Sequence, residues 1–174
     1  MLYDAVASRI AGRLYRRVVA DLGVIGLSHD ALIVDVGTGP GRLPILIADA
    51  FRGIRVEGID LSEEMITRAR QLADAAQTAD ASRVSFTVAD VADPPHLRGS
   101  VDVVVSTASM HHWPDAAAGI SEIARILRPG GQAVIYDPWA SLNSAVAPAK
   151  EAGLTARTQG IGFGIARLTL FSPA

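Results

Sequence analysis

One segment, Ile33 to Gly41, constrains the fold of this chain more than any other. It reads Ile-Val-Asp-Val-Gly-Thr-Gly-Pro-Gly, so β-branched residues run straight into glycines at positions 37, 39 and 41. The pattern predicts a strand followed by a glycine turn, and a helical pattern begins near Arg42. Glycine allows positive φ and lets the backbone approach a ligand closely. The segment therefore predicts a ligand-binding turn at the end of a strand.

The spacing of these glycines argues against two phosphate-binding motifs. A dinucleotide fingerprint, G-x-G-x-x-G, needs glycine at position 42, where this chain has Arg42. A P-loop needs Gly-Lys-Ser/Thr, and no lysine is nearby. The motif present is acid-x-G-x-G-x-G, led by Asp35. It disfavours a nicotinamide-dependent oxidoreductase.

Strand and helix patterns alternate on both sides of the glycine turn, which favours an α/β fold with a parallel sheet. A helical pattern over 1–27 predicts one or two amphipathic helices. We expect strands at 31–36, 55–59, 84–88, 101–106, 132–136, 155–158 and 166–171. We expect further helices at 42–51, 63–72, 116–127 and 144–152.

Acidic residues stand at the ends of the second and third predicted strands. In an open parallel sheet, ligands bind beyond the carboxyl ends of the strands, so Asp60 is placed to accept hydrogen bonds from ribose hydroxyls. Asp90 is placed to accept from the exocyclic amine of a purine. Each acid could instead be a capping or turn residue. The occurrence of acids at corresponding strand-end positions, Asp35, Asp60 and Asp90, favours one shared site.

The segment after the fourth strand, Met110 to Asp115, contains two imidazoles and an indole. His111 and His112 are candidates for a general base, because imidazole titrates near neutrality. The alternative is aromatic packing that closes a pocket and starts the next helix. No metal site is expected, since the remaining histidines, His29 and His96, lie on remote connectors.

Composition narrows the classes of function. The 174 residues are 49% hydrophobic and carry a net charge of -2, so one core is expected and nucleic acid is not an expected partner. The chain has no cysteine, which excludes disulfides, thiolate metal sites and cysteine nucleophiles. No apolar run approaches the roughly 18 residues of a membrane helix, and arginines interrupt the first segment. We therefore expect no signal peptide or membrane span, and a cytoplasmic location.

Five segments, in order, resemble class I S-adenosylmethionine-dependent methyltransferases, and most closely the small-molecule branch that includes quinone-biosynthesis C-methyltransferases. They are 34–41, 58–65, 89–91, 111–115 and 127–131. The resemblance extends from about residue 31 to 139. It implies a Rossmann-like three-layer sandwich whose seven-stranded, mostly parallel sheet has the order 3-2-1-4-5-7-6, with the last strand antiparallel.

The resemblance also implies a cofactor and residues that bind it. S-adenosylmethionine would place its methionine moiety at the glycine turn, its ribose at Asp60, and its adenine at Asp90 and the Val91 amide. Met65 would pack near the ring, and Asp35 would orient the amino group. The implied cofactor-binding residues are Asp35, Gly37, Thr38, Gly39, Gly41, Asp60, Leu61, Met65, Asp90 and Val91.

The function implied is direct in-line methyl transfer to a small molecule, with S-adenosylhomocysteine as product. Such a displacement needs alignment and desolvation more than a covalent nucleophile. The acceptor pocket must come from the N-terminal helices and the loops after strands four and five, with Tyr3, Tyr15, His111, His112, Trp113 and Trp139 as lining candidates. The main alternative is a non-catalytic protein that binds S-adenosylmethionine or S-adenosylhomocysteine. The acceptor and the oligomeric state stay open.

We expect a single methyltransferase domain over residues 1–174. It would contain N-terminal helices at 1–30, the cofactor-binding core at 31–139, and a helix with a terminal β-hairpin at 140–174.

Overall fold

The computed structural model describes residues 2–76, 81–162 and 164–174, except for the side chains of residues 2–11 and 81. The strands are β1 (Leu32–Val36), β2 (Arg55–Asp60), β3 (Val84–Val88), β4 (Val101–Thr107), β5 (Leu127–Pro138), β6 (Thr155–Gly162) and β7 (Ile165–Phe171). The helices are α1 (Leu2–Gly23), α2 (Arg42–Ala50), α3 (Glu63–Ala76), α4 (Ala116–Ile126) and α5 (Trp139–Glu151), with short 3₁₀ turns η1 (Ala81–Arg83) and η2 (Met110–His112).

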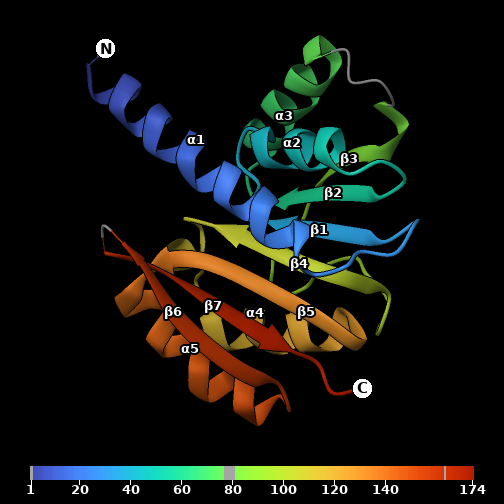
Figure 1. Ribbon diagram of the computed structural model, residues 1–174, viewed down its shortest axis with the longest axis vertical. Helices are drawn as coiled ribbons and strands as arrows, with labels where there is room; N and C mark the ends of the chain where they lie inside the picture. The colour runs from blue at the N-terminus through green and yellow to red at the C-terminus, as the bar shows by residue number, and fades with distance from the viewer. Residues whose placement is uncertain (1, 77–80, 163) are drawn as a thin grey trace.

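The strands form one sheet in the order β3-β2-β1-β4-β5-β7-β6 (Figure 1). β1 lies in parallel between β2 and β4, and Val36 at its end is in register with Ile59 and Ser106. β7 pairs antiparallel with both β5 and β6. The predicted α/β fold and strand order are therefore confirmed, and the carboxyl ends of the first five strands meet at one edge.

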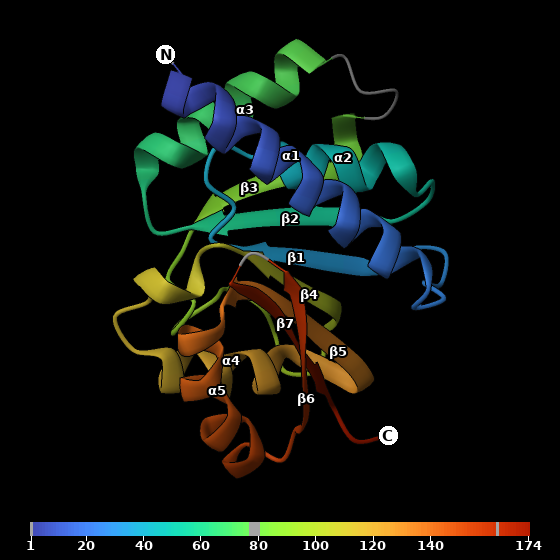
Figure 2. The ribbon, with the colours of Figure 1, turned by 60° about the vertical axis from the view of Figure 1, so that its left-hand side comes forward.

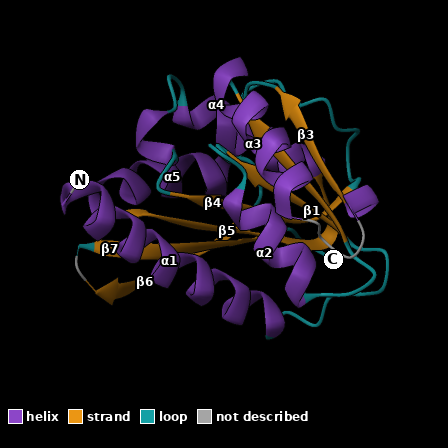
Figure 3. Ribbon diagram, turned by 90° about the horizontal axis from the view of Figure 1, so that it is seen from above, coloured by secondary structure: helices purple, strands orange, loops and turns teal. Residues whose placement is uncertain are grey.

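Helices cover both faces of the sheet, as the turned views show (Figures 2 and 3). Alternate residues of β1 divide between two cores, because successive strand side chains point to opposite faces. Ile33 packs with Val18 and Leu22 of α1 and with residues of α2, whereas Val34 packs with residues of α4 and α5. This three-layer arrangement leaves the carboxyl edge of the sheet open to loops.

β5 is longer than predicted, and α4 ends one residue earlier. The predicted strand, 132–136, becomes Leu127–Pro138 because Leu127 already pairs with Val101. The register then shifts before Gln132 pairs with Val103, so the proline and glycines of 128–131 lie at an irregularity inside the strand. The predicted bounds, 116–127 for the helix and 132–136 for the strand, leave residues 128–131 outside both elements.

The ends of the chain also differ from prediction. The N-terminal pattern forms one helix, α1. α5 begins at Trp139, not at residue 144, and it continues through Pro148. β6 extends to Gly162, four residues beyond the predicted end at 158, so Gly160 and Gly162 belong to the strand. Within the described chain, no helix is long and apolar enough to cross a membrane.

Candidate functional site

The amides of the glycine turn are used inside the protein. Gly37 and Thr38 both donate to the Ile59 carbonyl, at 2.9 and 3.0 Å, and Gly41 donates to the Thr38 carbonyl at 3.2 Å. Gly39 donates to a carboxylate oxygen of Asp60 at 2.8 Å. A pyrophosphate cradle needs free amides at this position. The turn is therefore not a phosphate-binding nest, which agrees with the glycine spacing.

The glycines of the turn differ in what surrounds them. A Cβ on Gly41 would lie 2.6 Å from Ala69 Cβ, and one on Gly37 would lie 1.7 Å from Ser109 Oγ. Around Gly39 no heavy atom of the residues that the structure describes lies within 4 Å of such a Cβ. All three have positive φ. The turn is thus packed against α3 on one side and Ser109 on another, and it is open at Gly39.

Asp35 lies in β1 just before the glycine turn, and its carboxyl group is buried with one oxygen unpartnered among the described residues. Its Oδ2 accepts a hydrogen bond from Thr38 Oγ1 at 2.7 Å, while Oδ1 has no hydrogen-bond partner among the described side chains and backbone. Burial raises the pKa of Asp35 to about 7, the Thr38 hydrogen bond opposes the shift, and the Asp60 charge adds to it. A buried carboxylate oxygen without a donor is costly. The site therefore fits a ligand that brings a cationic donor.

Tyr15 lies on α1, half-buried against the core on that face of the sheet, and is one of the residues predicted to line the acceptor pocket. Burial raises the pKa of Tyr15, the charge of Asp35 raises it further, and Arg42 lowers it. The side chain of Tyr3, another predicted lining residue, lies outside the described part of the chain.

Asp60 links the glycine turn to the end of β2. Its Oδ2 accepts from the Gly39 amide, and its Oδ1 accepts from the Ser62 amide at 2.9 Å. Each carboxylate oxygen keeps a second acceptor position, so Asp60 can act as a turn residue and still bind a hydroxyl pair. Leu61 follows with 62% of its surface exposed and offers an apolar surface at this edge.

Asp90 follows β3 at the same edge. Its Oδ1 accepts from the Ala92 amide at 2.9 Å. Among the hydrogen bonds of the described residues, none uses its Oδ2 or the amide of Val91, so an acceptor and a donor stand one residue apart. Val91 itself is buried, and Met65 on α3 is half-buried. This pair of groups can meet the complementary edge of a purine.

η2 carries the predicted histidines, and a buried acid fixes its position. Asp137, at the end of β5, is fully buried. Its Oδ2 accepts from the Met110 amide at 2.9 Å, and its Oδ1 lies 2.8 Å from Nδ1 of His111. The His111 side chain is 35% exposed. The His112 ring lies 3.9 Å from the His111 ring, centroid to centroid, and His112 is exposed.

The two tryptophans have different surroundings. Trp113 donates from Nε1 to Ser109 Oγ at 3.0 Å and packs against the core beneath α4, as the packing interpretation expected. Trp139 is 46% exposed at the start of α5 and lies near Gly160. Trp113 therefore supports the loop that touches the glycine turn, whereas Trp139 is free to contact a ligand.

Two features of the site were missed in the sequence. Asp137 received no role, although its place at a strand end is the same signal that identified Asp60. Ser109 was also passed over, because only the packed structure shows its contact with the glycine turn. Among the described residues, no group of three or more His, Cys, Asp or Glu side chains could hold a metal ion.

Comparison with known proteins agrees with this geometry. Residues 33–131, more than half of the chain, match the family model described as a methyltransferase domain. The chain belongs to the methyltransferase domain family. This methyltransferase domain is 37% identical over 115 residues to 27-O-demethylrifamycin SV methyltransferase of Amycolatopsis mediterranei, a match that covers 66% of this chain and 41% of that protein.

Other relatives extend the comparison. The domain is 42% identical over 103 residues to the chloroplastic tocopherol O-methyltransferase of Arabidopsis thaliana, covering 59% of this chain and 29% of that protein. It spans less than half the length of these curated relatives. A SAM-dependent methyltransferase from Aquifex aeolicus has the same fold, with a TM-score of 0.75, 18% identity and 87% of each chain covered.

Proposed function

We propose that this protein transfers a methyl group from S-adenosylmethionine to a small-molecule acceptor. The observation that carries the proposal is the unpartnered, buried oxygen of Asp35, the acid that leads the glycine turn in which Gly39 is uncrowded. The cofactor carries an ammonium group at its methionine end, which is the cationic donor that this oxygen lacks. A pyrophosphate group would find an acid there and no free amides. The family membership supports the same conclusion.

The remaining cofactor contacts follow from matching the acceptor, donor and apolar groups at the carboxyl edge of the sheet to the parts of S-adenosylmethionine. Asp60 binds the ribose hydroxyls through the free acceptor positions of its two oxygens. Leu61 and Met65 contact the faces of the adenine ring. Asp90 accepts from the adenine amine, and the Val91 amide donates to a ring nitrogen. Gly37, Thr38 and Gly41 shape the turn, and Gly39 provides the open side against which the methionine moiety lies.

In this proposal the protein aligns the cofactor with the acceptor and excludes water from the space between them. S-adenosylmethionine, when bound, supplies an electrophilic methyl group attached to a positively charged sulfur. Transfer to a bound acceptor needs no covalent intermediate on the protein, so no serine or lysine nucleophile is required. Tyr15, His111, His112 and Trp139 line the acceptor side, and Trp113 holds the loop between the two sides. The acceptor is a small molecule, as the names of the relatives suggest.

Asp60→Ala tests the cofactor assignment. Loss of hydrogen bonds to a charged group is expected to weaken S-adenosylmethionine binding by about 1.5 to 3 kcal/mol, or about ten- to a hundredfold, in isothermal titration calorimetry. Asp74→Ala on α3 serves as the control, because Asp74 is an exposed acid. An unchanged dissociation constant in folded Asp60→Ala protein would remove Asp60 from the site.

Turnover separates an enzyme from a non-catalytic binder. Formation of S-adenosylhomocysteine with a panel of small acceptors supports transfer. Tight binding of the cofactor with no product from any acceptor would favour the binding-protein alternative. Binding of a nicotinamide dinucleotide in place of S-adenosylmethionine would contradict the proposal altogether. The cytoplasmic location and the absence of a nucleic-acid partner stay predictions.

A further inference from the structure

We infer that Arg125 of α4 and His96 are positioning residues for recognition of the adenine ring. They hold the connector between β3 and β4, residues 89–100, in the shape that presents Asp90 and the Val91 amide to the purine. The inference rests on the proposed function, because it concerns how the same cofactor is recognised. It depends on three observations: the connector has no helix, two side chains bind it to other elements, and a closed turn with two prolines joins these anchors to Asp90.

The connector differs from the other crossovers between parallel strands. α2 joins β1 to β2, α3 joins β2 to β3 and α4 joins β4 to β5, whereas residues 89–100, all of which the structure describes, form turns and irregular backbone. A helix satisfies its backbone groups internally and so keeps its own shape. The connector lacks this support, so contacts with neighbouring elements must determine its shape.

Arg125 binds the connector to α4 at three points. Its Nη1 donates to the His96 carbonyl at 2.8 Å, and its Nη2 donates to the Pro94 carbonyl at 3.3 Å. Its own carbonyl accepts from the Gly99 amide at 3.0 Å. Its Nε donates to Glu122 at 2.6 Å, which fixes the plane of the guanidinium. A planar fork can reach two carbonyls and a carboxylate together, whereas the single ammonium of lysine cannot reproduce that geometry.

His96 binds the same segment to the sheet. Its side chain is 6% exposed, and its Nε2 lies 3.1 Å from one oxygen of Glu57 in β2. The other Glu57 oxygen accepts from Thr87 of β3 at 2.7 Å. The hydrogen bond with His96 lowers the pKa of Glu57, although burial opposes the shift. Glu57 is therefore ionised at neutral pH and can only accept, so Nε2 of His96 carries the hydrogen.

The path from these anchors to Asp90 is short and stiff. Pro94 and Pro95 fix two successive φ angles. Before them, Asp90 closes a turn, because its Oδ1 accepts from the Ala92 amide at 2.9 Å and its carbonyl accepts from the Asp93 amide at 3.1 Å. A displacement of the prolines is therefore transmitted to the Asp90 carboxylate and to the amide that follows it.

α4 also contacts the adenine end of the connector. Val91 is buried in the core that contains Ile120 and Ile123. A Cβ on Gly119 would lie 3.2 Å from Val91 Cγ1, so the helix backbone lies close to this side chain. One helix thus holds the connector at Val91 and again, through Arg125, beyond the prolines.

Calorimetry with two purine variants of the product tests the inference. S-inosylhomocysteine has a carbonyl oxygen in place of the adenine amine and a hydrogen on the neighbouring ring nitrogen, so it mismatches both Asp90 and the Val91 amide. Wild-type protein should therefore bind S-adenosylhomocysteine about ten- to a hundredfold more tightly than S-inosylhomocysteine. Arg125→Lys should weaken S-adenosylhomocysteine binding about tenfold and leave S-inosylhomocysteine binding nearly unchanged.

Arg128→Lys is the matched control. The hydrogen bonds of the Arg128 side chain go to Asp102 and to the Pro129 carbonyl, so this variant should keep the wild-type ratio of the two affinities. A general loss of structure weakens both compounds alike. An unchanged ratio in Arg125→Lys would therefore overturn the inference, whether or not both affinities fall.

A second variant and a second measurement keep the test decisive. His96→Gln keeps a donor on a more flexible side chain, so it should lower the same ratio by a smaller factor. Amide hydrogen exchange in ligand-free protein should be about tenfold faster at Ala92 and Asp93 in Arg125→Lys, and unchanged at Val104 in β4. If Arg125→Lys does not fold, an unchanged ratio in His96→Gln overturns the inference. Wild-type exchange rates at Ala92 and Asp93 in folded Arg125→Lys would also overturn it.

The outcomes separate this inference from the proposed function. If the wild type binds neither compound, the proposed function is refuted and this inference with it. If the wild type binds both equally tightly, Asp90 and Val91 do not distinguish adenine. The inference then fails, while methyl transfer from S-adenosylmethionine still stands.

Discussion

At the scale of single residues, the environment of Asp35 indicates that its carboxyl group is suited to a positively charged ligand. The fold buries this carboxyl until it is 2% exposed, satisfies one oxygen with Thr38, and leaves the other without a donor. Without a ligand, burial makes the ionised form of Asp35 less stable than the protonated form, and its pKa therefore rises. A bound cation would favour the ionised form instead. The proton on Asp35 and a cationic ligand therefore compete.

The raised pKa predicts how stability depends on pH. The folded pKa of about 7 lies above the ordinary value of 3.8, so the folded state holds this proton more tightly. The resulting stability is fully present below about pH 4 and is lost as pH rises to 7, with a slope of up to about 1.4 kcal/mol per pH unit. Urea unfolding of ligand-free protein should show Asp35→Asn losing this slope, and exposed Asp74→Asn keeping it. An identical slope in Asp35→Asn would contradict the assignment.

Substitution of two glycines in the same turn by alanine is expected to destabilise the protein by unequal amounts. Gly37→Ala adds a Cβ that collides with Ser109 at a φ of +69°, so it should destabilise the protein by about 2 to 5 kcal/mol. Gly39→Ala meets open space at a φ of +54° and should cost only about 1 to 2 kcal/mol of backbone strain. Thermal unfolding compares them. Equal costs would mean that Ser109 moves away freely.

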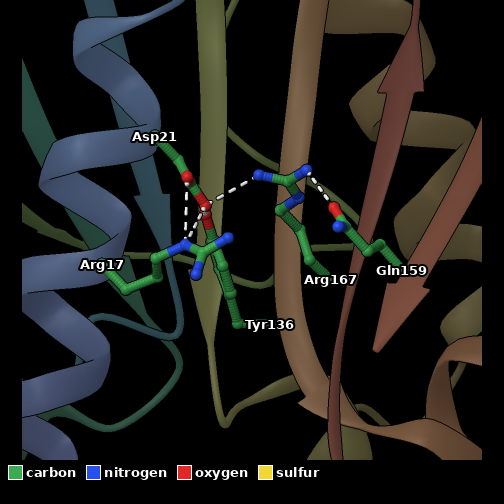
Figure 4. Close-up of polar contacts among 5 residues, drawn as sticks. All are labelled: Arg17, Asp21, Tyr136, Gln159 and Arg167. Carbon is green, nitrogen blue, oxygen red and sulfur yellow. Dashed lines mark hydrogen bonds and ion pairs between the residues drawn. The ribbon is translucent and has the colours of Figure 1, made fainter. Parts of the chain in front are cut away.

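At the scale of elements, α1 is joined to the sheet by a polar cluster (Figure 4). Asp21 accepts from Tyr136 of β5 at 2.7 Å, from Arg167 of β7 at 2.8 Å, and from Arg17 at 3.1 Å. Burial alone would raise the pKa of Asp21, but these hydrogen bonds bring it below its ordinary value. Burial and the Asp21 carboxylate raise the pKa of Tyr136. The cluster therefore connects the helix that carries Tyr15 to the strand that carries Asp137.

Tyr136→Phe should weaken this connection. Removing a hydrogen bond to a charged group is expected to cost about 1.5 to 3 kcal/mol of unfolding free energy in urea denaturation. Arg17→Ala is the control, because the Arg17 side chain is 47% exposed and an exposed ion pair contributes about 0 to 1 kcal/mol. If the double variant Tyr136→Phe/Asp21→Asn loses the sum of the single losses, the two residues are not coupled.

At the scale of the whole molecule, the family resemblance predicted the strand order, and patterns in the sequence predicted most element bounds approximately. Periodicity and glycine placement are local signals, and β1 to β4 follow from them. The prediction failed where pairing between distant residues decides the structure. Leu127 joins β5 because Val101 lies beside it, and Asp137 becomes a site residue because its partner, His111, lies 26 positions away. Local sequence patterns predict neither the pairing of Leu127 with Val101 nor the contact between Asp137 and His111.

The insertion of β7 has a consequence for how the protein is made. β5 receives its outer neighbour, β7, from residues 165–171, which are synthesised after the other described strands. Until then, a growing chain that already contains Asp137 exposes an unpaired strand edge, which is a hazard for aggregation. Antiparallel pairing of β7 closes that edge across Gln132 to Pro138. Asp137, the acid that contacts His111, is therefore expected to become rigid only after β7 has been synthesised.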